Sequence, residues 1–237
     1  MGKSAGILGS VADQINSESG GTMILKNGEI FDRNFDVRKA DVSADNGTIT
    51  QIAPELNGKE ALDVSGCLVA PGFVDIHIHG CDGADTCDGT RGSIAKMAKH
   101  LVRNGVTSFC PTTMTVPPDV IRKAILAARD CMVNPPEGAL VRGVNMEGPY
   151  ISPERIGAQK GDNVRRPDAG EFFRLYKETG RIIKLIDLAP EVEGADDFIA
   201  QVSPYCKVSF AHSMADYGQT THAFAEGITH VTHLFNA

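Results

Sequence analysis

The stretch GFVDIHIHG, residues 72–80, carries His77 and His79 at the end of an apolar run. Side chains two apart on a β-strand point to the same face, so both imidazoles face one side. Together they can bind one divalent metal ion. The alternative is a pair of buried, hydrogen-bonded histidines, but two such side chains are difficult to satisfy in a water-poor place without a metal. We therefore predict a metal-binding pair.

Three later apolar runs end on side chains of the same kind. GVNMEGPYIS contains Glu147, VSFAHS contains His212, and ITHVTHL contains His233. A buried carboxylate is costly unless it is exposed, paired or bound to a metal. Because the carboxyl ends of parallel strands meet at one edge, we expect these groups to converge with the first two histidines. The remaining histidines, which we expect to pack or face solvent, are His100, His222 and His230.

The predicted ligand set contains nitrogen and oxygen but no thiolate, which favours zinc or an iron-type divalent ion in a hydrolytic site. The six cysteines include no C-x-x-C pair. We expect most of them to be reduced, small core residues of a cytoplasmic protein. Cys81 and Cys87 flank a Gly/Asp loop and could instead lie near a site. The complete set is Cys67, Cys81, Cys87, Cys110, Cys131 and Cys206.

Composition limits the partners. The 237 residues carry a formal net charge of −7, no tryptophan and 6% aromatic residues. An acidic chain without a basic run argues against nucleic acid or an anionic membrane as partner. No apolar stretch approaches the roughly 20 residues of a membrane helix, and the N-terminus does not have the pattern of a signal peptide. We expect a small-molecule substrate.

The elements that position these residues alternate along the chain. Six apolar runs begin at Leu68, and amphipathic helical patterns separate them. This alternation predicts a parallel β/α fold. A doubly wound sheet could use six strands, whereas a (β/α)8 barrel needs eight and about 250 residues. The helical patterns cover residues 91–103, 118–132, 168–179, 195–203 and 216–226.

The chain divides into three predicted parts. Residues 1–21 are rich in Ser, Gly and Ala and indicate a flexible extension. Residues 22–66 alternate apolar and polar side chains, with hairpin signals at Asn27-Gly28 and Asn46-Gly47, and predict a small antiparallel β unit. Residues 67–237 form the strand–helix region. The small unit needs partners from elsewhere, because a few short strands bury little apolar surface.

In these motifs the chain resembles the amidohydrolase superfamily and, within it, the N-acetylglucosamine-6-phosphate deacetylases. The motifs are LVAPGFVDIHIHG, GVTSFCPTT, NMEGPYIS, GAQ, LAPE, AHS and THLFNA, in that order. The resemblance implies a (β/α)8 TIM barrel of the amidohydrolase type, with about six β/α units present, beside part of a small β-sandwich domain. It also implies hydrolysis of N-acetyl-D-glucosamine 6-phosphate to D-glucosamine 6-phosphate and acetate, in amino-sugar catabolism, by a homodimer when full length.

The resemblance assigns roles to named residues. Glu147, His212 and His233 correspond to the principal metal ligands, and His77 with His79 to a pair found in members that hold a second ion, so one or two ions are expected. Residues that correspond to substrate contacts are Ala158, Gln159, Asn236 and Ala237.

The general base of this family is an aspartate at the end of the eighth barrel strand, which would lie beyond Ala237. The groups that hold the substrate phosphate would lie there too. We therefore expect the 237-residue chain to be a poor or inactive enzyme by itself.

Two other functions stay open. One is another amidohydrolase, such as a deaminase, a dihydroorotase-like enzyme or a D-aminoacylase. Enzymes related to dihydroorotase often use a carboxylated lysine on strand four, and Lys184 lies within the fourth apolar run. The other is a fragment that binds metal without turnover, since fold and ligands do not guarantee catalysis.

Overall fold

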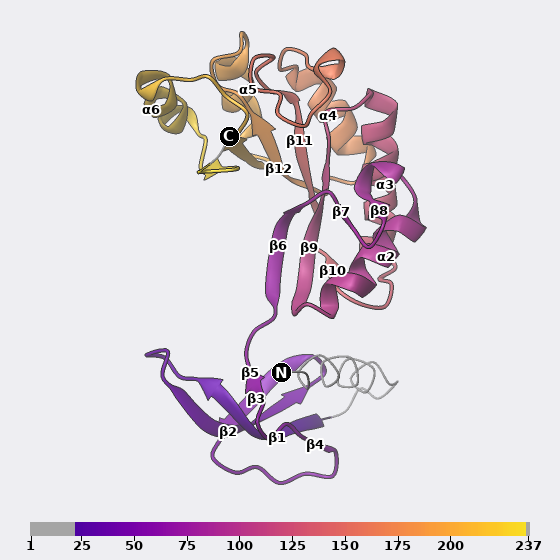
Figure 1. The fold of residues 1–237 in the computed structure, drawn as a ribbon, viewed down its shortest axis with the longest axis vertical. Coiled ribbons are helices and arrows are strands. Elements are labelled where there is room, and N and C mark those ends of the chain that lie inside the picture. Colours follow the sequence, from indigo (N-terminus) through magenta and orange to yellow (C-terminus); the bar gives the residue numbers. More distant parts are fainter. Residues whose placement is uncertain (1–21, 236–237) are drawn as a thin grey trace. The chain divides into compact units, whose positions relative to one another are not determined.

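The computed structural model describes residues 22–235, which divide into two compact units with the boundary in the chain between Gly72 and Phe73. The predicted extension 1–21 lies outside these residues, as do Asn236 and Ala237. Within the described part of the chain, no helix combines the length and apolar character needed to cross a bilayer. Figure 1 shows the fold, with both units coloured along the sequence.

The first unit is a five-stranded sheet of mixed direction. β1 is central: β2 pairs with it antiparallel, whereas β4 and β5 pair with it in parallel. The prediction of an antiparallel unit over residues 22–66 is therefore wrong for β4, and β5 lies beyond that range. The bounds are β1 (Thr22–Phe31), β2 (Val37–Asp45), β3 (Thr48–Ala53), β4 (Ala61–Asp63) and β5 (Leu68–Val69).

The two hairpin signals have different outcomes. Asn46-Gly47 joins β2 to β3, and both residues have positive φ, 47° and 75°, as the predicted two-residue turn requires. Asn27-Gly28 lies inside β1, so the prediction of a turn there is wrong. The register shifts between Leu25 and Gly28 and forms a bulge. The Asn27 backbone N–H leaves the ladder and donates to Asp41 Oδ1 at 2.7 Å.

The second unit is built on a parallel sheet, with a helix between most of the successive strands. The strands are β6 (Phe73–Ile78), β9 (Val106–Thr113), β10 (Leu140–Val141), β11 (Val144–Tyr150), β12 (Ile183–Leu188), β13 (Lys207–Phe210) and β14 (His230–Val231). The helices are α2 (Arg91–Val102), α3 (Pro118–Val133), α4 (Ala169–Glu178), α5 (Ala195–Val202) and α6 (Tyr217–Glu226). The short elements are β7 (Gly80–Cys81), β8 (Ala84–Asp85) and the 3-10 helices η1 (Thr86–Asp88) and η2 (Gly161–Asn163).

All five predicted helices form. For three of them, the side chain of the residue just before the helix explains where the helix begins. Thr90, Asp168 and Asp216 precede α2, α4 and α6, and each accepts a hydrogen bond from the backbone N–H three residues later. The predicted apolar positions of α2 and α3 are mostly buried, whereas Val102 and Leu126 are half-buried. The buried positions of α2 include Ile94, Met97 and Leu101. Figure 1 shows α2 and α3 beside β9 and β10. The buried apolar side chains of these elements belong to one hydrophobic core.

The strand order separates the two candidate architectures. β6 pairs with β9, and β10 and β11 follow one another along the opposite side of β9. β12, β13 and β14 are then added in sequence order, each parallel to the last. A doubly wound sheet would reverse direction at a switch point, and this order does not reverse. The unit is therefore part of a (β/α)8 barrel.

The sheet is strongly curled. In a flat sheet, the five spacings between β6 and β14 would put these strands about 24 Å apart. The ring centroids of His77, on β6, and His233, just after β14, are instead 5.0 Å apart. Curling therefore brings side chains from the first and last of these strands into one place.

Candidate metal centre

Glu147 is the centre of a cluster of imidazoles. Its side chain is 1% exposed, and it lies on β11, where all seven residues are buried. Four histidine Nε2 atoms surround the carboxylate. Oε1 is 3.4 Å from His77, 3.1 Å from His212 and 2.9 Å from His233, and Oε2 is 2.9 Å from His79.

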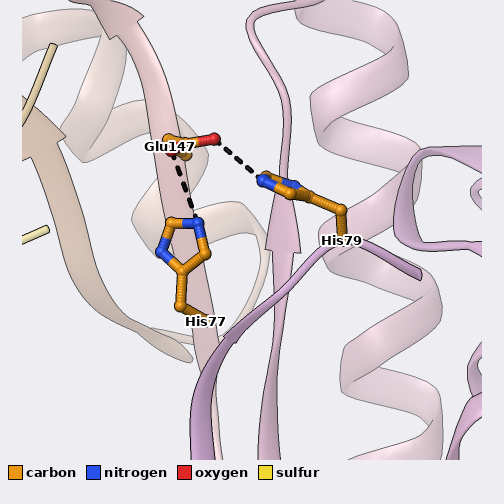
Figure 2. A group of neighbouring side chains, drawn as sticks. All are labelled: His77, His79 and Glu147. Atoms are coloured by element: carbon orange, nitrogen blue, oxygen red, sulfur yellow. Dashed lines mark ion pairs between the residues drawn. The ribbon is translucent and has the colours of Figure 1, made fainter. Parts of the chain in front are cut away.

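These side chains come from four places along the carboxyl edge of the sheet. His77 is on β6 and His79 immediately follows it, and both point toward Glu147, as Figure 2 shows. His212 lies two residues after the end of β13, and His233 lies two residues after the end of β14. All five side chains predicted from the sequence therefore meet. They form two groups of potential metal ligands that share Glu147.

The ring orientation of two histidines is fixed by backbone carbonyls. Nδ1 of His212 lies 2.8 Å from the Arg155 carbonyl oxygen, and Nδ1 of His79 lies 3.2 Å from that of Thr112. A carbonyl only accepts, so each Nδ1 carries a proton. In the neutral ring, Nε2 then presents its lone pair. This is how histidines that bind metals are commonly oriented.

His77 is held differently. The Asn145 amide nitrogen is 3.1 Å from His77 Nδ1 and donates to the Ile76 carbonyl oxygen at 3.2 Å. His77 Nε2 and Asn145 Oδ1 are both buried, and neither makes a hydrogen bond within residues 22–235. Asn145 lies two residues before Glu147 on β11 and shares its face. It therefore supports the cluster, although the sequence analysis did not single it out.

The arrangement fits a cation. If the imidazoles are neutral, the Nε2 lone pairs of His79 and His212 face carboxylate oxygens of Glu147 at hydrogen-bond distance. This contact is repulsive unless a positive charge lies between the nitrogen and the oxygen. Protons on the rings or a divalent ion would supply that charge. His77 Nε2, 3.4 Å from Glu147 Oε1, adds another nitrogen aimed at the same place. The N/O set with no thiolate suits zinc or iron.

The charges in the cluster shift the pKa values in a consistent way. Burial opposes ionisation of Glu147, but hydrogen bonds from His212 and His79 and the close approach of His77 outweigh it and hold its pKa well below the usual range. The hydrogen bond to Glu147 raises the pKa of His212. Burial lowers the pKa of His79, but its hydrogen bond and attraction to Glu147 leave the value raised. The carboxylate is thus ionised throughout the physiological range.

The residues predicted to contact substrate are placed unequally. Ala158 is exposed, and Gln159 is buried with both ends of its amide engaged. Its nitrogen donates to Glu147 Oε2 at 2.5 Å, and its oxygen accepts from the Thr115 backbone N–H at 2.7 Å. Gln159 therefore touches the cluster directly. The segment lies against His212, since a Cβ on Gly157 would be 3.3 Å from His212 Cε1. Asn236 and Ala237 lie outside the described residues.

Asp187 is a functional candidate that the sequence analysis missed. It is fully buried on β12, its Oδ1 accepts from the Thr232 hydroxyl at 2.9 Å, and its Oδ2 has no partner among the described residues. Burial, followed by repulsion from Glu147, raises its pKa to about 7. The signal available in the sequence was a single carboxylate inside the apolar run IKLIDLAP.

The other histidines lie away from the cluster. His230 is half-buried on β14, and neither group of potential ligands includes it. His100 is half-buried in α2, and His222 is exposed in α6, where its Nε2 is 3.3 Å from Asp196 Oδ2. A strand-end position, and not the residue type alone, distinguishes the clustered histidines.

The chain is similar in sequence to known proteins. The chain is 38% identical over 182 residues to an N-acetylglucosamine-6-phosphate deacetylase of Danio rerio, covering 74% of this chain and 45% of that protein. It is 32% identical over 224 residues to the Bacillus subtilis (strain 168) protein of the same name, covering 91% and 57%.

A solved structure agrees with this. A variant of the Mycobacterium smegmatis N-acetyl-D-glucosamine-6-phosphate deacetylase, in complex with N-acetyl-D-glucosamine-6-phosphate, matches with a TM-score of 0.80 and 27% identity, covering 92% of this chain and 56% of that one. The chain thus spans about half the length of the relatives it matches. Residues 68–237 match the amidohydrolase family profile and include the whole cluster around Glu147. With the partial (β/α)8 barrel, this match shows that the chain belongs to the amidohydrolase family.

Proposed function

We propose that these residues form the metal-binding part of a hydrolase that removes the acetyl group of N-acetyl-D-glucosamine 6-phosphate. The observation that carries this proposal is the convergence of four imidazoles on the buried Glu147. The deacetylases that the chain resembles supply the substrate class. An ion at this place would polarise the amide carbonyl and lower the pKa of a water molecule that attacks it.

We assign Glu147, His212 and His233 to the principal ion. His77 and His79 share Glu147 with this group and would hold a second ion where one is bound. Zinc or iron is proposed from the donor types alone. Gln159 would hold Glu147 in place by donating to Oε2, which leaves Oε1 directed toward His212 and His233.

The assembly and compartment are also proposals. The six cysteines form no disulfide, which is consistent with a reducing cytoplasm. A homodimer is proposed for the full-length protein from the family resemblance. The substrate would be a small amino-sugar phosphate.

A dihydroorotase-like alternative would need Lys184 at the metal. Lys184 is exposed on β12, and Asp187, three residues later, is buried on the opposite face. A carboxylated Lys184 would therefore point away from Glu147, which disfavours that alternative.

The test measures substrate binding and acetate release by the 237-residue chain loaded with Zn²⁺. We expect N-acetyl-D-glucosamine 6-phosphate to bind in calorimetry only when the metal is present, and Glu147→Gln to abolish that binding. Unphosphorylated N-acetylglucosamine and dihydroorotate serve as comparison ligands. Acetate release is measured in the same samples.

Two results would overturn the proposal. One is a chain that binds Zn²⁺ but not the amino-sugar phosphate, while binding or hydrolysing a comparison ligand. The other is a chain that binds no Zn²⁺ at all, because the cluster would then be an ion-pair network without a metal.

A further inference from the structure

Three buried polar side chains form a chain of hydrogen bonds next to the metal centre. The Thr232 hydroxyl donates to Asp187 Oδ1 at 2.9 Å, and Ser209 Oγ is 2.8 Å from the same hydroxyl. Asp187 and Ser209 are 0% exposed, and Thr232 is 8% exposed. No residue of this triad is among the potential metal ligands.

The triad links three neighbouring segments of the sheet. Asp187 and Ser209 are register partners on β12 and β13, and Ser209 is the partner of His230 on β14. Thr232 follows the end of β14 and directly precedes His233. The hydrogen bonds therefore run across the sheet to the residue beside a proposed ligand.

His233 needs such support because its backbone is unusual. Its φ is +53°, in the left-handed region that residues other than glycine rarely adopt. β14 has only two residues and pairs, within the described part of the chain, with β13 alone. The backbone N–H of Thr232 donates to the Phe210 carbonyl at 2.8 Å. A second anchor at Thr232 would keep the following turn from relaxing.

His212 has the same backbone conformation but a different support. Its φ is +49°, its ring donates to the Arg155 carbonyl, and its own carbonyl accepts from the Ser152 N–H at 3.0 Å. These bonds hold His212 directly. For His233, the side-chain bonds of the triad act on the preceding residue instead.

The cost of burying Asp187 supports a role beyond packing. A buried carboxyl group disfavours folding unless its oxygens are hydrogen-bonded, and Asp187 Oδ2 has no partner within residues 22–235. An aliphatic side chain would fill this position in an apolar strand with less loss of stability. The acceptor that Asp187 offers to Thr232 is the interaction an aliphatic residue could not provide.

We propose that Asp187 and Thr232 are positioning residues: through the Thr232 hydroxyl they fix the backbone before His233 and so hold its imidazole at the metal centre. This inference rests on the proposed metal-binding function of the cluster.

The experiment compares Thr232→Val with Thr232→Ser in the 237-residue chain. Valine keeps the volume of threonine and removes the hydroxyl, whereas serine keeps the hydroxyl. We expect Thr232→Val to weaken Zn²⁺ binding by about 10- to 100-fold, the usual effect of losing a group that orients a ligand. Thr232→Ser should restore most of the affinity. The readout is the Zn²⁺ dissociation constant from competition with a chelating dye.

A double-mutant cycle with His233→Ala separates positioning from general packing. If Thr232 acts through His233, Thr232→Val has no further effect on Zn²⁺ affinity once His233 is replaced. Asp187→Asn, which retains an acceptor oxygen, should bind Zn²⁺ more tightly than Asp187→Ala. Thermal unfolding in the presence of a chelator checks that each variant folds.

The outcomes distinguish this inference from the proposed function. An unchanged Zn²⁺ affinity in Thr232→Val, with a wild-type chain that binds Zn²⁺, overturns the inference and leaves the proposed function intact. An equal loss of affinity with and without His233 overturns it as well, because the effect would then not pass through His233. A wild-type chain that does not bind Zn²⁺ overturns both.

Discussion

Asp41 in the small sheet and Glu147 in the barrel sheet are both buried carboxylates, with 2% and 1% of the residue exposed. Asp41 accepts hydrogen bonds from the backbone N–H groups of Asn27 and Leu56, at 2.7 and 2.9 Å, and Lys26 lies 3.9 Å away. Glu147 is surrounded by four imidazoles and the Gln159 amide.

The partners determine what each carboxylate can do. Backbone N–H groups keep their protons, so Asp41 is satisfied permanently and holds a bulge and a loop in place. Its pKa is lowered chiefly by those two N–H groups. Imidazoles can lose their protons, so the positive charge around Glu147 can be exchanged for a metal ion. A buried carboxylate thus indicates a metal site only when its partners are themselves potential ligands.

The largest expected effect is that of Glu147→Gln on metal binding. Structural zinc sites release about 10–16 kcal/mol over their ligands, so losing one charged ligand should weaken Zn²⁺ binding by at least about 100-fold. Chelator competition gives the dissociation constant. Retention of near wild-type affinity would show that the carboxylate is only a partner of protonated histidines.

The matched change in the small sheet is Asp41→Asn. The asparagine nitrogen would face one of the two backbone N–H donors, which destabilises that sheet. We expect a lower melting temperature and an unchanged Zn²⁺ dissociation constant. A coupled loss of metal affinity would break the distinction between the two carboxylates.

The affinity for Zn²⁺ is also expected to depend on pH. The pKa values of His79 and His212 are raised, so protons compete with the metal below and somewhat above the ordinary histidine value of about 6.5. Well below both values, Zn²⁺ affinity should fall by up to about 100-fold per pH unit, because two protons are displaced. Titrations between pH 5 and 8 measure the slope; a flat profile would exclude these imidazoles as ligands.

The metal-free chain should respond in the opposite sense. A histidine pKa that is raised on folding stabilises the fold fully below the unfolded value, and that contribution is lost as pH rises through the folded value. The melting temperature in a chelator should therefore decrease as pH rises from about 6 to 8. Asp41 has the reverse effect on the pH dependence. Its carboxyl pKa is lowered on folding, so its contribution to stability is present at neutral pH and is lost when pH falls through the folded-state pKa.

A smaller effect is expected at Gly148, directly after Glu147. Its φ is +76°, and an added Cβ would lie 2.1 Å from Thr115 Oγ1. Overpacking in Gly148→Ala should destabilise the fold by about 1–3 kcal/mol, in addition to the cost of backbone strain. The substitution should also weaken Zn²⁺ binding. Gly47→Ala is the control: its φ is +75°, but nothing lies within 4 Å. Equal losses in the two variants would exclude the predicted contact with Thr115.

The smallest effect is expected for His222→Ala. This exposed imidazole pairs with Asp196 on the surface. Such a pair contributes about 0–1 kcal/mol, and Zn²⁺ affinity should be unchanged. A measurable loss of affinity would show that histidines outside the strand ends also bind the metal.

Much of the fold could be predicted from local patterns. The five helical ranges and the alternation with apolar strands were recognisable because helix periodicity and N-terminal caps depend on neighbouring residues. The Asn46-Gly47 turn was predictable for the same reason. The same dipeptide at Asn27-Gly28 gave a wrong prediction of a turn, because the bulge that forms there depends on Asp41, which is distant in sequence.

The run from Leu68 shows a second limit. It looked like one strand, but Leu68–Val69 pairs with β1 and Phe73–Ile78 pairs with β9. Apolar character alone does not tell which sheet a residue joins, because that depends on partners far along the chain.

For the candidate site, the sequence determined which residues could act as ligands. Their chemistry and their strand-end positions are local properties, and the period of two placed His77 and His79 on one face. Only the tertiary structure decided that His233 lies 2.9 Å from Glu147, that carbonyls fix His79 and His212, and that Asp187 accepts a hydrogen bond from Thr232. These depend on how far the sheet curls, and curling results from the packing of all its strands and helices together.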